Sequence, residues 1–167
     1  DNRLKFSING DLKKLEINEL LIKSDEISLS SYGLVKNVLD KNIIDVDLGV
    51  KIETSGKKIN FFADENINKY FENLHKINFD THLKYNNGSL VTRGNLISSL
   101  GNLSTKAVFY SKKKNGFDIK VSSEKFDLGN LILSNNLGFT GLEINFNSPS
   151  IKFNKELEVS GKLLNTN

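Results

Sequence analysis

Strict alternation of side-chain character over residues 44–54 limits the folds that are open to this chain. The segment reads IDVDLGVKIET, in which each even-numbered residue from Ile44 to Ile52 is aliphatic and each odd-numbered one is charged or glycine. A β-strand directs successive side chains to opposite faces, so this segment predicts a strand with one apolar face and one solvated face. Similar alternation recurs along the chain, and it predicts a protein built almost wholly from such strands.

Turn sequences divide the rest of the chain into further strands. Asn86-Asn87-Gly88 and Asn115-Gly116 are typical of hairpin turns, and Pro149 lacks the amide that a central strand needs. Residues 32–41 are ambiguous, because the spacing of their apolar residues also fits one helical turn. The sequence predicts an all-β fold, an elongated and curved antiparallel sheet, with strands near residues 4–10, 15–22, 27–31, 43–54, 77–85, 89–98, 103–111, 117–121, 142–146, 151–153 and 157–163.

Residues 64–74 are the segment with the periodicity of a short helix. Asp64 can cap the free amides of the first turn. The apolar residues recur at positions i, i+3, i+4 and i+7, which gives one stripe formed by Ile67, Tyr70, Phe71 and Leu74. We interpret this segment as a helix that closes the end of the sheet. A membrane-surface or partner-docking helix is the alternative.

Composition narrows the class of protein. The 167 residues include no cysteine, which excludes disulfides, and no apolar run near the roughly 18–20 residues of a membrane-spanning helix. The net charge of +3 is weak, and arginine occurs only at Arg3 and Arg93, which disfavours nucleic-acid binding. Because the chain has no methionine, we interpret residues 1–167 as a single domain that is an internal fragment of a longer protein.

No residue cluster in the sequence proposes a reaction. His75 and His82 are seven residues apart and would project to opposite faces of a continuous strand, which does not suit a metal site. Asp45 and Asp47 share a face, but such pairs occur on any amphipathic strand. Phosphate-binding glycine loops and nucleophile motifs are absent from the sequence. We therefore expect a protein that is not an enzyme and that uses no metal or cofactor.

The role of the apolar face has three candidate interpretations. It could fill the core of a closed β-sandwich or barrel. The alternation within one strand is the same in a closed fold and in an open sheet, so it does not tell the two apart. It could belong to a β-solenoid binding module of the adhesin type, with a glycan or protein ligand. In the third interpretation the sheet is half open, and its apolar face binds acyl chains through buried area, at about 0.8 kcal/mol per methylene.

Several segments resemble one family of envelope proteins. Residues 8–22, INGDLKKLEINELLI, look like the glycine-leucine entry to a β-repeat of the AsmA/TamB-like proteins, and residues 28–34, SLSSYGL, are similar to a polar stretch that the family closes with Gly-Leu. Residues 126–132, FDLGNLI, followed by Leu137-Gly138, resemble the FDLG element of the TamB-type translocation and assembly module. The family's membrane anchor and carboxy-terminal domain have no counterpart here, so the resemblance implies an internal slice.

The resemblance implies a β-taco, an elongated sheet folded around a hydrophobic groove, in a periplasmic protein whose parent is anchored in the inner membrane. It further implies phospholipid transport along the groove and support of outer-membrane protein assembly through a BamA-like partner, which docks on parts outside this chain. Carried onto this sequence, the groove residues would be Leu4, Phe6, Ile8, Ile44, Val46, Leu48, Val50, Ile52, Ile77, Phe79, Leu83, Tyr85, Phe117, Ile119, Val121, Leu142, Ile144 and Phe146.

Overall fold

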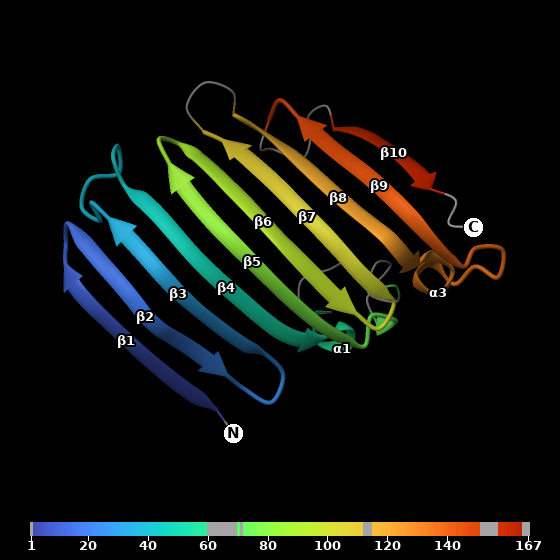
Figure 1. Cartoon of the computed structure of the whole chain (residues 1–167), viewed down its shortest axis with the longest axis horizontal. Helices are drawn as coiled ribbons and strands as arrows, with labels where there is room; N and C mark the ends of the chain where they lie inside the picture. The colour runs from blue at the N-terminus through green and yellow to red at the C-terminus, as the bar shows by residue number, and fades with distance from the viewer. Residues whose placement is uncertain (1, 60–69, 71, 112–114, 151–156, 165–167) are drawn as a thin grey trace.

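Within the residues that the structure describes, ten strands form one antiparallel sheet in which they follow their order in the chain (Figure 1). The computed structural model describes residues 2–59, 70, 72–111, 115–150 and 157–164. The strands are β1 (Arg3–Asp11), β2 (Lys14–Lys23), β3 (Ser28–Lys36), β4 (Asp45–Ser55), β5 (Lys76–Asn86), β6 (Ser89–Ser98), β7 (Gly101–Tyr110), β8 (Gly116–Asp127), β9 (Phe139–Ser148) and β10 (Glu158–Leu164). The predicted all-β, curved antiparallel sheet is confirmed, and β1 and β10 form its two edges.

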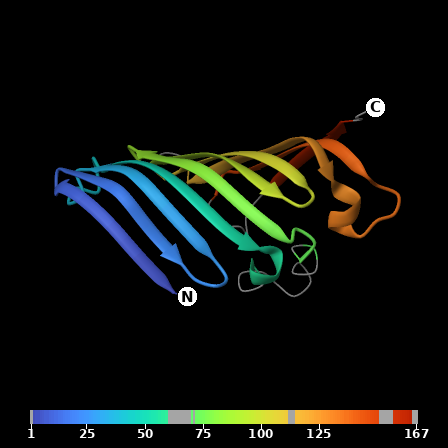
Figure 2. The ribbon, with the colours of Figure 1, turned by 60° about the horizontal axis from the view of Figure 1, so that its bottom comes forward.

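Two short helices lie at one end of the sheet. They are α1 (Gly56–Ile59), which follows β4, and α3 (Leu128–Ile132), which follows β8. Figure 2 shows both on the same side of the curved sheet. The helix predicted over residues 64–74 falls mostly outside the described residues, within which Tyr70 and Glu72 are helical.

Some bounds of the predicted strands differ in the structure. Residues 32–36 continue strand β3, so the helical alternative for that part of residues 32–41 is wrong, and the turn begins at Asn37. Ile44 precedes β4, which begins at Asp45. The strand predicted near residues 151–153 lies outside the described residues.

A small hydrophobic cluster lies at the end of the sheet that carries the helices. Its buried members come from β5, β8, β9 and the two connections that precede β5 and β7: Leu74, Ile77, Leu100, Phe126 and Leu142. Leu131 of α3 packs against this cluster. Two further apolar residues are buried outside this cluster: Ala107 of β7, and Phe117, which is 2% exposed and lies at the end of β8 opposite to Phe126.

The segment Phe126-Asp127-Leu128-Gly129 builds the turn that covers this core. Phe126 is 2% exposed, and the carboxylate of Asp127 accepts the backbone amide of Asn130 at 3.0 Å and its Nδ2 at 2.6 Å. This is the hydrogen-bonding pattern of a helix N-cap, and it starts α3. A side chain at Gly129 would collide with the carbonyl oxygen of Leu137, so the returning chain needs glycine there.

Hydrogen bonds join this turn to two neighbouring connections. The side-chain amide of Asn73 donates to the carbonyl of Asn130 at 2.9 Å, and the hydroxyl of Ser99 donates to the carbonyl of Asn73 at 3.1 Å. The amide of Asp127 donates to the carbonyl of Leu100 at 2.8 Å. We call the described part of this assembly, residues 72–75, 98–101 and 126–133, the end cap. It covers one set of strand ends and leaves both edge strands unpaired.

Candidate functional site

The register of the sheet brings apolar residues of neighbouring strands side by side. Leu48 of β4 lies opposite Leu83 of β5, and Ile119 of β8 lies opposite Phe146 of β9. Residues directly opposite in an antiparallel pair point to the same face. Following the pairs from β1 to β10 therefore defines one continuous surface, which we call the apolar face.

All the predicted groove residues except Ile44 belong to the apolar face. β1 contributes Leu4, Phe6 and Ile8, β4 contributes Val46, Leu48, Val50 and Ile52, β5 contributes Ile77, Phe79, Leu83 and Tyr85, β8 contributes Phe117, Ile119 and Val121, and β9 contributes Leu142, Ile144 and Phe146. Ile44 stands in the connection before β4.

Sequence reasoning missed further members of the apolar face. These are Leu15, Ile17, Leu20 and Ile22 of β2, Leu29 and Val35 of β3, Leu90 and Leu96 of β6, Leu103, Ala107 and Phe109 of β7, and Val159 and Leu163 of β10. On β2 the alternation changes phase between Ile17 and Leu20, where the register with β3 shifts. Such a bulge hides the period of two from inspection of the sequence.

Exposure of the apolar face is graded across the sheet. On β1, Leu4 and Phe6 are each 67% exposed, and Val159 on β10 is 58% exposed. Val50, near the middle, is half-buried, whereas Leu142 beneath the end cap is 4% exposed. Large apolar side chains therefore meet solvent at both edges of the sheet.

Small residues form a row across the middle of the apolar face. The pairing of β3 to β8 aligns Ser31, Val50, Thr81, Gly94, Thr105 and Val121. The hydroxyl of Thr81 donates to the carbonyl of Arg93, and that of Thr105 donates to the carbonyl of Gly94, both at 3.1 Å. These two hydroxyls are thus satisfied by the backbone of β6 and leave methyl groups on the apolar face.

A glycine two residues before a leucine recurs in the sequence at Gly10, Gly94 and Gly161, and this recurrence predicts three strand ends. Gly10 lies near the end of β1, but Gly94 and Gly161 lie inside β6 and β10. The prediction is therefore wrong for Gly94 and Gly161.

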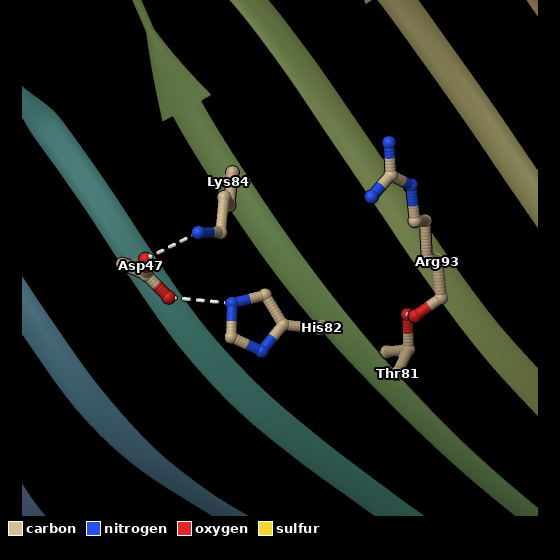
Figure 3. Close-up of polar contacts among 5 residues, drawn as sticks. All are labelled: Asp47, Thr81, His82, Lys84 and Arg93. Atoms are coloured by element: carbon tan, nitrogen blue, oxygen red, sulfur yellow. Dashed lines mark hydrogen bonds and ion pairs between the residues drawn. The ribbon is translucent and has the colours of Figure 1, made fainter.

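The opposite face, which we call the polar face, carries ion pairs. Nε2 of His82 lies 2.5 Å from Oδ1 of Asp47, and Nζ of Lys84 lies 2.9 Å from Oδ2 of the same carboxylate (Figure 3). The hydrogen bond from Lys84 is the main cause that lowers the pKa of Asp47 from its ordinary value. Desolvation raises this pKa by less than Lys84 lowers it, and the hydrogen bond with His82 lowers it a little further. Asp45, on the same strand and face, lies 3.9 Å from Lys36.

A second carboxylate is held in the same way on β9. Oε1 of Glu143 lies 3.1 Å from Nζ of Lys120, and Oε2 lies 3.8 Å from Nζ of Lys162. The hydrogen bond from Lys120 is the main cause that lowers the pKa of Glu143. Both carboxylates thus pair with basic side chains of neighbouring strands on an exposed face of the sheet.

The two histidines do not share a strand. β5 begins at Lys76, and His75 precedes it with a left-handed backbone, at φ 44°. In the part of the chain that the structure describes, no group of three or more His, Cys, Asp or Glu residues is placed to hold a metal ion. Nor does any described helix have the length and apolar character to span a membrane.

Comparison with protein-family models, with curated proteins and with solved structures finds no match to this chain. The site is therefore defined by its own geometry, which is a continuous apolar face with exposed apolar side chains at both edge strands and with Phe117 and Phe126 buried toward the two ends of β8.

Proposed function

We propose that the apolar face binds the acyl chains of phospholipids, and that this chain is a non-enzymatic segment of a lipid conduit of the AsmA/TamB type. The observation that carries the proposal is the exposure of large apolar side chains on a continuous sheet face. Soluble monomers rarely expose contiguous apolar patches larger than a few hundred square ångströms unless the patch binds something. Leu4 and Phe6, each 67% exposed, extend this face to the very edge of the sheet.

The arrangement favours a track that runs across the strands. The end cap covers one set of strand ends, whereas β1 and β10 are open edges. Small side chains such as Ser31, Thr81 and Gly94 stand lower above the sheet than Ile52 and Phe79 in the neighbouring row. An acyl chain lying along the small residues would contact apolar groups on both sides. Each methylene removed from water would contribute about 0.8 kcal/mol.

The proposal extends to the cellular setting that the resemblance implies. In that setting the chain lies in the periplasm, as part of a parent protein anchored in the inner membrane. Phospholipid would move along the apolar face between the two membranes. A BamA-like protein would dock on other parts of the parent, and through it the protein would support outer-membrane protein assembly.

Lipid extraction and uptake of a fluorescent fatty acid test this function on the full chain. We expect co-purified phospholipid and saturable uptake. Phe6→Ser should lower uptake, because it removes an exposed apolar side chain, while Lys5→Ser on the other face of the same strand should not. Absence of bound lipid together with absence of uptake by the folded chain would contradict the proposal, and would favour a glycan- or protein-binding module.

A further inference from the structure

Two basic side chains face each other on the polar face. Arg93 of β6 lies directly opposite Lys106 of β7, in a row that continues to His82 of β5 on one side and Lys120 of β8 on the other. Figure 3 shows His82 and Arg93 on adjacent strands. Directly opposed side chains have Cβ atoms about 4.5–5.5 Å apart, and like charges at that separation destabilise a sheet.

The outer members of this row have carboxylate partners, but the inner two do not. His82 contacts Asp47, and Lys120 contacts Glu143 at 3.1 Å. Some other directly opposed charges on this face are of opposite sign, as in Lys51 and Asp80, and some are alike, as in Lys14 and Lys36. Within the described ranges, no carboxylate forms an ion pair with Arg93 or Lys106. Among the residues that the structure describes, neither charge therefore has a counter-ion.

The polar face is hollowed beside this pair. A depression of about 610 Å³ is lined by Arg93 and Lys106 together with Asn95 and Ser104. The hydroxyl of Ser104 lies 3.0 Å from Oδ1 of Asn95, which orients the Nδ2 group of Asn95 as a further donor. The carboxylate of Asp80 also lines the depression, but Nζ of Lys51 lies 3.3 Å from it. Donors and positive charge thus converge on one open depression.

We propose that Arg93 and Lys106 bind a phosphate-type oxyanion in this depression. The planar guanidinium of Arg93 offers paired N–H donors that match two oxygens of a phosphate, and the ammonium of Lys106 adds a second charge from the adjacent strand. The bound anion removes the repulsion between the two cations. The site lies on the face opposite the proposed acyl-chain track, so it does not depend on that function.

Titration of the full chain with inorganic phosphate at low salt, followed by amide chemical shifts, tests the proposal. We expect saturable shifts confined to β6 and β7. Arg93→Gln and Lys106→Gln should each weaken binding on the order of tenfold, the loss of one charge-assisted contact. The control is Arg3→Gln, because Arg3 lies opposite Lys23 in a like-charged pair that does not line this depression. It changes the net charge equally and should leave the affinity unchanged.

The bound phosphate group could belong to a lipid headgroup or to a free anion. Sedimentation with phosphatidylglycerol vesicles, with phosphatidylcholine vesicles as reference, distinguishes these two sources. Binding to phosphatidylglycerol that requires Arg93 identifies a lipid headgroup, and phosphate binding alone identifies a free anion. Either result supports the site. Shifts scattered over all lysines, or equal losses in Arg3→Gln and Arg93→Gln, would overturn it. Fatty-acid uptake should persist in Arg93→Gln. Loss of phosphate binding and loss of acyl-chain binding can therefore be observed separately.

Discussion

Gly129 faces the carbonyl oxygen of Leu137 so closely that a methyl group on its α-carbon would come within 1.8 Å of that oxygen. The contact fixes the path of the chain that returns from α3 to β9. The same turn of the end cap begins with Phe126, which is 2% exposed. The closed end of the apolar face thus depends on a glycine that makes no side-chain contact of its own.

Gly129→Ala should lower the free energy of unfolding by about 1–3 kcal/mol, because the backbone around Leu137 must move to admit the methyl group. Chemical denaturation measures the change. Gly138→Ala is the matched control, since a Cβ there meets no atom within 4 Å, and it should change stability by less than about 0.5 kcal/mol. Equal effects of the two substitutions would show that the close approach is unimportant.

Asp127→Ala should cost about 0.5–2 kcal/mol, the range for loss of a helix N-cap. The carboxylate accepts two hydrogen bonds from Asn130, at 3.0 and 2.6 Å. Asp127→Asn keeps a side-chain oxygen for the backbone amide and should cost less than alanine. Thermal or denaturant unfolding of the three proteins checks the order, and an asparagine variant as unstable as the alanine variant would contradict the capping role.

Substitutions on the apolar face should show which of its residues stabilise the fold and which bind acyl chains. Leu142→Ala should cost about 2–5 kcal/mol, because Leu142 is 4% exposed in the core. Phe6→Ala, at a position 67% exposed, should cost under about 1 kcal/mol and yet reduce fatty-acid uptake. A large loss of stability in Phe6→Ala would mean that the face is closed in solution.

Acid should destabilise the sheet in part through Asp47. Its folded-state pKa is lowered from the ordinary value of 3.8 by its hydrogen bond with Lys84. Its contribution is therefore present above the unfolded pKa and is lost as the pH falls through the folded pKa. Since the side chain of Asp47 is 43% exposed, this contribution should stay under about 1 kcal/mol.

Asp47→Asn should accordingly lose less stability than the original chain between pH 6 and about pH 3. Denaturant titrations at the two pH values measure the difference. Asp45→Asn, on the same strand and face with a longer contact to Lys36 of 3.9 Å, serves as the control. An acid response of Asp47→Asn identical to that of the unchanged chain would contradict the role of the Lys84 contact.

Much of the fold is predictable because the period of a strand is local. The alternation at Val46, Leu48 and Val50 fixes which residues share a face, and short hairpin turns such as Asn87-Gly88 fix the neighbouring strand. The bulge between Ile17 and Leu20 disrupts this signal on β2, which is why the apolar residues of that strand were missed.

The end cap and the basic pair depend on contacts between distant residues. In the end cap, Nδ2 of Asn73 donates to the carbonyl of Asn130, and the amide of Asp127 donates to the carbonyl of Leu100, so residues far apart in the sequence hold α3 in place. Arg93 and Lys106 are well separated in the sequence, and only the register of β6 with β7 makes them neighbours. Whether the sheet is open or closed also depends on residues far apart in the sequence, because an open sheet requires that β1 and β10 do not pair with each other.

Contact between the apolar face and acyl chains can be measured by site-specific photo-crosslinking. A photoreactive amino acid is placed at Val50 on the apolar face or at Lys51 on the polar face, and the protein is irradiated in a Gram-negative periplasm. We expect phospholipid adducts at position 50 and few or none at position 51, by mass spectrometry of the purified protein. Equal adducts at both positions, or no adducts at position 50 in a folded protein, would show that the apolar face does not bind lipid.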